Sequence, residues 1–158
     1  MKPVVYIETT VISYLTAWPS RDVIRLAQQQ QTREWWDTQR QFFEAVCSEV
    51  VEREAAVGDS TAAAERLKIL QTLPLLAVKP EAGLLAADLI AKVKLPARAQ
   101  TDALHVAIAA TNGVSYLLTW NCRHLTNAVL RPRIEQVCRD NGLEPPLICT
   151  PADLMEPP

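Results

Sequence analysis

The sequence predicts a three-layer α/β fold with a central, mostly parallel sheet of four to five strands. Short apolar runs rich in β-branched residues alternate along the chain with longer segments of helical periodicity. Prolines, glycines and polar residues bound most of these runs, which is typical of short strands buried on both faces. Strands separated by helices predict βαβ units and therefore parallel pairing.

The composition predicts a single domain over residues 1–158. Of the 158 residues, 49% are apolar and 22% charged, which is enough to bury one good core. No window reaches the roughly 18 apolar residues of a membrane span, and the first residues run into a strand pattern rather than a signal sequence. We therefore expect a cytoplasmic protein with no membrane segment. The four cysteines form no Cys-x-x-Cys pair, so we expect reduced, structural thiols.

The first half of the chain predicts two strands and several helices. The first strand is β-branched and aromatic, and the second is an apolar run that ends at Ser48, a good helix N-cap. Ser20 or Asp22 can cap one helix and Thr32 the next. In order, we expect a strand at residues 4–7, helical spacing over 11–15, helices at 22–30 and 32–43, a strand at 45–47, and helices at 49–56 and 61–70.

The second half repeats this alternation. Pro74 and Pro80 bound the third strand, and an amphipathic helix follows it. Thr101 is the expected N-cap of a helix with almost no polar face, which must be buried, and Asn112-Gly113 ends it. In order, we expect a strand at residues 75–78, helices at 81–93 and 102–111, a strand at 115–118, a helix at 132–141 and an edge strand at 147–149.

Four oxygen-bearing side chains lie where an apolar run stops or a helix begins. Sites in open α/β sheets form outside the carboxyl ends of the strands, near the point where the strand order reverses. We expect these side chains to converge there and to hold a hard divalent cation. Each also has an ordinary alternative, as a surface charge, a helix cap or a turn former, and one residue of register decides which glutamate of 49–54 faces the pocket. The candidates are Glu8, Glu54 (or Glu49 or Glu52), Asp102 and Asn121.

Charge and glycine content bound the function further. The net charge of −2 is not a strong nucleic-acid signature. Only four glycines occur and none forms a phosphate loop, which disfavours nucleotide-dependent enzymes. Arginines near both ends could line a phosphate-binding rim or lie on solvated helix faces. They are Arg21, Arg25, Arg123, Arg131, Arg133 and Arg139.

The motifs resemble those of PIN domains, most closely the VapC-type toxins of bacterial toxin–antitoxin pairs. The resemblance is carried by residues 6–13 (Tyr-Ile-Glu-Thr-Thr-Val-Ile-Ser), 48–54, 101–109 and 118–121, and it extends over about 4–154. It implies a metal-dependent endoribonuclease that hydrolyses RNA phosphodiester bonds with Mg²⁺ or Mn²⁺, and a small antitoxin protein as inhibitor. PIN-type toxins commonly pair through helices, so we also expect a homodimer, with the face around Trp35 and Trp36 as one route.

The resemblance also implies roles for individual residues. Glu8, Glu54, Asp102 and Asn121 take the catalytic positions, with the metal on Glu8 and Asp102. Two departures stand out, because Glu8 is one methylene longer than the usual aspartate and Asn121 is neutral. With three carboxylates we expect a single-metal reaction whose metal binding depends on pH. Substrate or supporting contacts are expected from Thr9, Thr10, Thr119, Arg123 and His124.

Other interpretations stay open. The departures at Glu8 and Asn121 allow a PIN-like module that binds RNA or protein without turnover. A signalling receiver domain also gathers acids at a sheet edge, but it needs an aspartate at the end of the third strand, where this chain has Val78-Lys79. A zinc set around Cys122 and His124 matches no closed tetrahedral spacing. His105 is expected to be a hydrogen-bonded core histidine.

Overall fold

A sheet of five parallel strands forms the centre of the computed structural model, which describes residues 1–158. The strand order is β3-β2-β1-β4-β5, so the order reverses at β1. A receiver domain has the order 2-1-3-4-5, and this alternative is therefore excluded. The predicted fold class is confirmed. The strands are β1 (Val4–Ile7), β2 (Glu44–Ser48), β3 (Leu75–Leu76), β4 (Tyr116–Leu118) and β5 (Leu147–Cys149).

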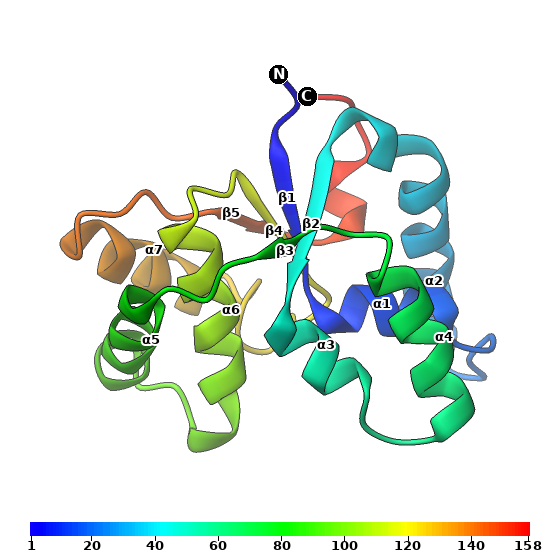
Figure 1. Ribbon diagram of the computed structural model, residues 1–158, viewed down its shortest axis with the longest axis horizontal. Coiled ribbons are helices and arrows are strands. Elements are labelled where there is room, and N and C mark those ends of the chain that lie inside the picture. Colours follow the sequence, from blue (N-terminus) through cyan, green and yellow to red (C-terminus); the bar gives the residue numbers. More distant parts are fainter.

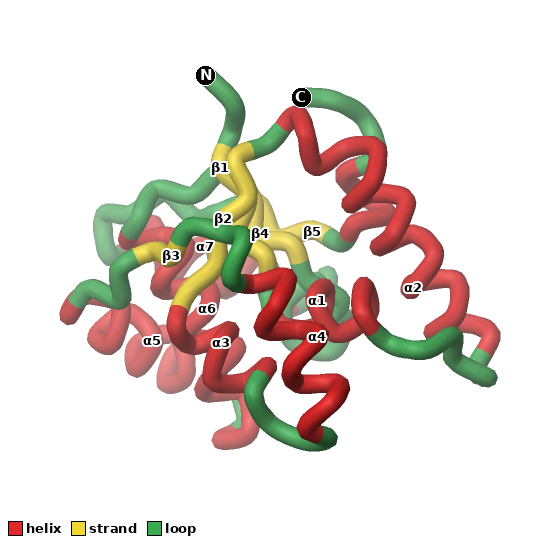
Figure 2. The backbone as a smooth tube through the Cα atoms, turned by 45° about the vertical axis from the view of Figure 1, so that its right-hand side comes forward, coloured by secondary structure: helices red, strands yellow, loops and turns green.

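Helices cover both faces of this sheet. In Figure 1, α1 to α4 lie on one side of the strands and α5 to α7 on the other. Figure 2 shows the strands in yellow between these two helical layers. None of the helices combines the length and the apolar character needed to cross a membrane. The helices are α1 (Thr9–Thr16), α2 (Val23–Glu34), α3 (Glu49–Ala55), α4 (Ser60–Leu70), α5 (Pro80–Val93), α6 (Gln100–Thr111) and α7 (Leu130–Asp140).

The apolar core is one connected cluster that includes both helical layers and the central strands. Tyr6 and Ile7 of β1 and Leu117 and Leu118 of β4 have no exposed surface. Helix α6 is buried along most of its length, as its apolar sequence predicts. It ends at Asn112, and Gly113 follows with a φ of 66°, a left-handed conformation that glycine adopts without steric cost.

All four cysteines are free thiols. Cys47, Cys138 and Cys149 are buried, and burial raises the pKa of Cys47 to about 12, of Cys138 to about 11 and of Cys149 to about 12. These three side chains therefore stay protonated and behave as small apolar residues. Cys122 is exposed on the loop that follows β4.

The expected break between two helices at residues 30–32 is absent. Helix α2 continues directly into a π-helical turn, η1 (Trp35–Gln39), and a 3₁₀ turn, η2 (Arg40–Phe42). Thr32 does not cap a new helix, because its hydroxyl donates to the carbonyl of Gln28 at 2.7 Å and accepts the indole N–H of Trp120 at 2.7 Å. The expected cap at Asp22 is confirmed, since its carboxylate accepts the backbone N–H of Arg25.

Two other boundaries differ from the prediction. Helix α6 begins at Gln100, after a 3₁₀ turn (Ala97–Ala99), so Thr101 lies inside the helix and is not its N-cap. Asp102 nevertheless lies in the first turn. Strand β3 is only two residues long, because Cys47 and Ser48 at the end of β2 are the only residues that pair with it.

Trp35 belongs to the protein's own core. Its side chain has no exposed surface and packs against Trp36 and Phe43, with ring centroids 6.4 and 5.9 Å away. The guanidinium of Arg40 lies over the Trp36 ring at 4.5 Å. Trp35 is therefore not free to form the homodimer contact that the sequence suggested.

Two leucines of α5 provide a test of this packing. Leu89 is fully buried and Leu84 is 76% exposed. We expect Leu89→Ala to lower the free energy of unfolding by about 2–5 kcal/mol, because it leaves a cavity in the core. The matched variant Leu84→Ala should change it by about 0.5 kcal/mol or less. Urea unfolding followed by circular dichroism measures both, and equal losses would contradict the described packing of α5.

Candidate active site

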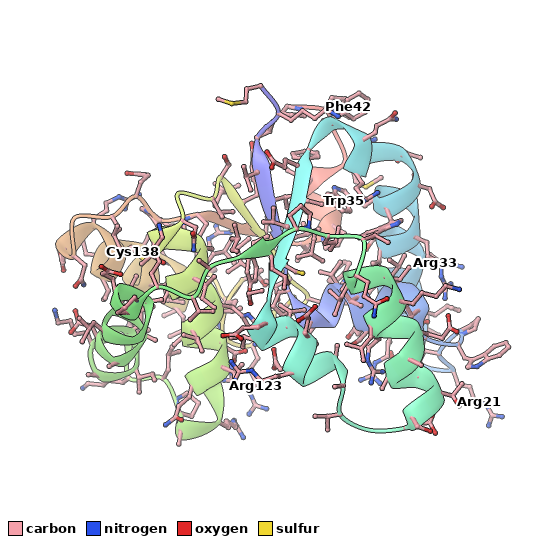
Figure 3. All side chains as sticks on the ribbon, in the orientation of Figure 1. Arg21, Arg33, Trp35, Phe42, Arg123 and Cys138 are labelled. Carbon is pink, nitrogen blue, oxygen red and sulfur yellow. The ribbon has the colours of Figure 1, made fainter.

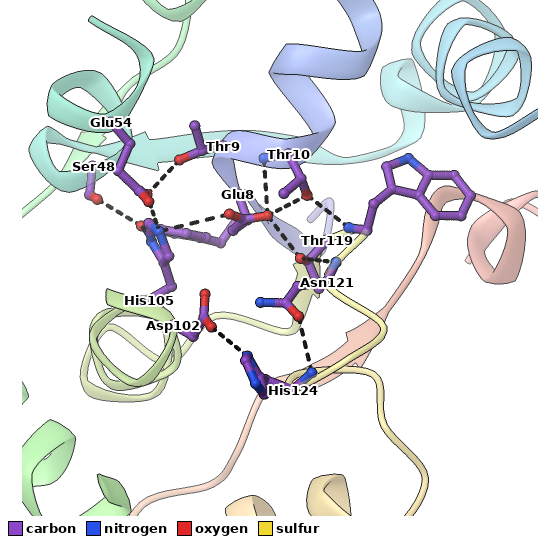
Figure 4. Close-up of polar contacts among 12 residues, drawn as sticks. Glu8, Thr9, Thr10, Ser48, Glu54, Asp102, His105, Thr119, Asn121 and His124 are labelled. Carbon is purple, nitrogen blue, oxygen red and sulfur yellow. Dashed lines mark hydrogen bonds and ion pairs between the residues drawn. The ribbon is translucent and has the colours of Figure 1, made fainter. Parts of the chain in front are cut away.

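The candidate site lies at the carboxyl ends of β1 and β4, where the strand order reverses. Ile7 pairs with Leu118 in the parallel register, so the next residues, Glu8 and Thr119, leave the sheet side by side. The backbone N–H of Glu8 donates to the carbonyl of Leu118 at 3.1 Å. The sequence predicted a site at this edge. Figure 4 shows the side chains that meet there.

Glu8 has one oxygen that is held and one that is free. Its Oε2 accepts the backbone N–H of Thr10 at 3.1 Å, the hydroxyl of Thr10, and the hydroxyl of Thr119 at 2.8 Å. The first of these bonds makes Glu8 the N-cap of α1. Its Oε1 accepts no hydrogen bond, and the ring Nε2 of His105 lies 3.9 Å away. The carboxylate is thus fixed in orientation through Oε2 alone.

Burial dominates the electrostatics of Glu8. The residue is only 3% exposed, and burial raises the pKa of its carboxyl above the ordinary value. The nearby His105 ring and the hydrogen bonds from Thr10 and Thr119 lower this pKa, but they offset the effect of burial only in part. Desolvation, rather than repulsion between carboxylates, is therefore the main cause of the raised pKa of Glu8.

Glu54 is the glutamate of α3 that reaches this site. Its Oε1 accepts the hydroxyl of Thr9 at 2.7 Å and a hydrogen bond from Nε2 of His105 at 2.6 Å, while its Oε2 accepts none. Glu49 is exposed and pairs with Arg53 at 3.5 Å. Glu52 makes no side-chain hydrogen bond or ion pair. The register left open by the sequence is therefore that of Glu54.

The pKa of Glu54 shifts in the opposite direction from that of Glu8. Burial is the largest single influence and raises this pKa, but the hydrogen bond and the charge of His105, together with the Thr9 hydroxyl, outweigh it. The net result is a lowered pKa, so Glu54 is ionised at neutral pH. The pKa values of Glu8 and Glu54 therefore shift in opposite directions, because only Glu54 is hydrogen-bonded to the buried imidazole of His105.

Asp102 comes to the site from the first turn of α6. Its Oδ2 accepts from Nδ1 of His124 at 3.1 Å, and its Oδ1 makes no hydrogen bond. In Figure 4 its carboxylate lies between His105 and Asn121. A chain of hydrogen bonds continues from His124 through Asn121 and Thr119 to Glu8. Glu8 and Asp102 thus belong to one polar network, but Asp102 is not among the residues whose potential ligand atoms lie within 4.8 Å of one another.

Asn121 uses its side chain to shape the loop after β4. Its Oδ1 accepts the backbone N–H of His124 at 3.0 Å, which is the turn-forming role that the sequence left as the alternative. Its backbone N–H donates to the Thr119 hydroxyl at 3.0 Å. The group that remains free is the amide NH₂, a donor, which suits a phosphate oxygen rather than a cation.

Three polar residues of the site were not among the predicted site residues. The ring Nδ1 of His105 lies 2.7 Å from the hydroxyl of Tyr6, which lies 2.7 Å from the hydroxyl of Ser48. All three are fully buried. His105 is a hydrogen-bonded core histidine, as predicted, but its partners include Glu54. A tyrosine in an aliphatic strand and a histidine on a buried helix were the available signals, since buried polar atoms need partners.

The six arginines do not form a common rim. Figure 3 shows Arg123 and Arg21 in separate parts of the molecule. Arg131 and Arg139 both pair with Glu135 on their own helix. Arg123 is exposed on the loop directly after Asn121 and Cys122, so it is the arginine that follows the site residues most closely in the chain.

The donor atoms fit a hydrated divalent cation. One ligand atom from each of Glu8, Glu54 and His105 lies within 4.8 Å of the others. Asp102 does not belong to this group, so it would reach the same cation through water. Nε2 of His105 already donates to Glu54, so the free oxygens of Glu8 and Glu54 are the better donor atoms of the group. Mg²⁺ needs few protein carboxylates because it keeps several waters. A scan against protein-family models found no match to the chain, and a search of curated proteins found none.

Proposed function

We propose that this protein is a metal-dependent endoribonuclease of the PIN type that hydrolyses RNA phosphodiester bonds. One observation carries the proposal. Glu8, Glu54 and Asp102 each have one carboxylate oxygen held by hydrogen bonds and the other without a hydrogen bond. Three oriented carboxylates at a sheet edge suit Mg²⁺ or Mn²⁺. The resemblance of the sequence motifs to PIN domains supports RNA as the substrate.

The proposed roles follow from the contacts of each side chain. Glu8 and Asp102 hold the cation directly or through water. When bound, the cation polarises the scissile phosphate and lowers the pKa of bound water. Glu54, which is ionised, accepts a hydrogen bond from the attacking water and orients it. The NH₂ group of Asn121 and the guanidinium of Arg123 donate to phosphate oxygens.

Thr9, Thr10, Thr119 and His124 act on the carboxylates in this proposal. Each donates a hydrogen bond to Glu8, Glu54 or Asp102, so that their carboxylates keep one orientation. Partners of metal ligands of this kind tune both affinity and activity. An antitoxin partner and a homodimer remain predictions from the resemblance, and a cytoplasmic location remains a prediction from the sequence composition.

A second candidate function is recognition of RNA or protein without turnover. It is favoured by Asn121, which supplies a turn-forming carbonyl where the resemblance implies an acid. The site then has three carboxylates and fewer groups to activate water. RNA cleavage separates the two candidates, because only the nuclease breaks a phosphodiester bond.

Metal-dependent cleavage is the first expected outcome. The protein should cut mixed RNA with Mn²⁺ or Mg²⁺ and stop when EDTA removes the metal. Asp102→Asn and Glu8→Gln should each lower the rate by about 100-fold or more, since each removes a charge that holds the cation. Gel electrophoresis of end-labelled RNA measures the rate.

The matched control is Glu49→Gln, which removes an exposed carboxylate from the same helix, α3, that carries Glu54. Its rate should equal that of the unchanged protein. Equal losses in all three variants would contradict the assignment of the site. Binding of RNA without cleavage at any metal concentration would favour the second candidate function.

Glu8 should link metal binding and stability to pH. Its pKa is raised in the folded protein, so a proton must leave before the metal binds. We therefore expect Mn²⁺ affinity to increase as the pH rises through this raised pKa. Isothermal titration calorimetry in two buffers of different ionisation enthalpy measures both the affinity and the protons released. Affinity that is constant from pH 5 to pH 8 would contradict this assignment.

The stability of the metal-free protein should depend on pH in the opposite direction from the metal affinity, because Glu8 lowers it as the pH rises. A raised pKa means that the stability contributed by Glu8 is complete below its ordinary pKa of 4.5 and is lost as the pH rises through the folded value. Glu54, whose pKa is lowered, loses stability only below its ordinary value. In EDTA at pH 8, Glu8→Gln should thus melt above the unchanged protein by a few degrees, about 3 °C for 1 kcal/mol. Saturating Mn²⁺ should reverse this order in the same melting experiment.

A further inference from the structure

We propose that His105 is a positioning residue that fixes the Glu54 carboxylate. On the core side, Tyr6 is hydrogen-bonded both to the His105 ring and to Ser48. The inference rests on the proposed function for its catalytic consequence. Its basis is a chain of three short contacts that runs from the core to the site: Ser48 Oγ to Tyr6 Oη at 2.7 Å, Tyr6 Oη to His105 Nδ1 at 2.7 Å, and His105 Nε2 to Glu54 Oε1 at 2.6 Å. Figure 4 shows the last of these contacts, between His105 and Glu54.

The direction of the last hydrogen bond follows from the chemistry of its acceptor. An ionised carboxylate has no proton, so Glu54 can only accept and Nε2 of His105 must donate. A donor bond from an imidazole to a carboxylate is charge-assisted and stronger than a neutral one. Nε2 therefore has no free lone pair, and His105 serves the site by holding Glu54 rather than as a metal ligand or a base.

The other ring nitrogen is fixed from the core side. Burial raises the pKa of the Tyr6 phenol, so the hydroxyl keeps its proton and remains a hydrogen-bonding partner for Nδ1. The Tyr6 and His105 rings lie 5.6 Å apart and are tilted by 57°. Ser48, at the end of β2, bonds to Tyr6 and makes no capping bond to α3. A side chain that the sequence assigns to a helix cap thus supports the histidine.

Glu54 needs such support because it reaches the site from a solvent-facing helix. Its side chain is 36% exposed, whereas that of His105 is fully buried. A long, half-exposed glutamate samples several rotamers unless hydrogen bonds restrict it. His105 and Thr9 both donate to the same oxygen and leave Oε2 without a hydrogen bond. Correct orientation of a reacting group accounts for a large part of catalysis, so the loss of His105 should reduce turnover rather than RNA binding.

Two amide substitutions separate positioning from packing. In His105→Gln the amide nitrogen reaches the place of Nε2 and can still donate to Glu54. In His105→Asn it reaches only the place of Nδ1, on the Tyr6 side. We expect His105→Asn to lower kcat for Mn²⁺-dependent RNA cleavage by about 10- to 100-fold with KM unchanged. His105→Gln should recover most of this loss, although both variants should melt at lower temperature.

A second readout needs neither metal nor RNA. The sequence has only two histidines, so imidazole N–H signals in a proton NMR spectrum are readily assigned. The buried 2.6 Å bond to Glu54 should give a downfield Nε2–H signal that exchanges slowly with water. The signal should vanish in His105→Gln and move upfield in Glu54→Gln, while Glu49→Gln should leave it in place.

These results distinguish failure of the inference from failure of the proposed function. Equal kcat values for the Gln and Asn variants, or an unchanged kcat in His105→Asn, would overturn the positioning role of His105. Neither result would contradict the proposed nuclease function. If the unchanged protein cleaves no RNA with any metal, the proposed function fails, and the NMR signal alone decides the inference. If the Asn variant does not fold, the signal in Glu54→Gln decides it: a shift supports the bond, and no shift overturns it.

Discussion

The parallel pairing of β1 with β4 determines where the candidate site of this protein lies. The register that aligns Ile7 with Leu118 brings Glu8 beside Thr119, although 110 residues separate them in the chain. The strand order reverses at β1, so α1 leaves toward one face of the sheet while α6, on the other face, brings Asp102 and His105 toward the same edge. A buried carboxylate with one free oxygen is the direct result of this topology.

Keeping this carboxylate buried has an energetic cost that the surrounding hydroxyls reduce. Hydrogen bonds from Thr10 and Thr119 lower the pKa of Glu8, yet burial still prevails and keeps it raised. Glu54 is in the opposite state, since His105 and Thr9 keep it ionised. A bound cation would supply the positive charge that Glu8 lacks, so affinity for metal and instability without metal have the same physical cause. Sites of this kind are commonly less stable than the rest of the fold.

Much of this fold could be predicted from the sequence, because the apolar runs and their bounding residues are local signals. The edge strand at Leu147–Cys149 and the buried helix α6 follow from such signals. The position of Glu8 follows from the rule on the carboxyl ends of parallel strands, and that of Asp102 from its place in the first turn of a buried helix. Two predicted helix caps were wrong for the same reason, because each side chain has a hydrogen-bond partner far away in the sequence. Thr32 bonds to Trp120 and stays inside a helix, and Ser48 bonds to Tyr6 instead of capping α3. No local pattern shows that a side-chain hydroxyl has a partner about 40 to 90 residues away.

The most direct test of the central claim is a crystal structure of the protein soaked in Mn²⁺, with the ion located by its anomalous scattering. Our account predicts one strong peak bonded to the free oxygen of Glu8, and to Asp102 directly or through water, while Nε2 of His105 still bonds to Glu54. No peak at this edge of the sheet, or a peak coordinated by His105 in place of the carboxylates, would contradict it.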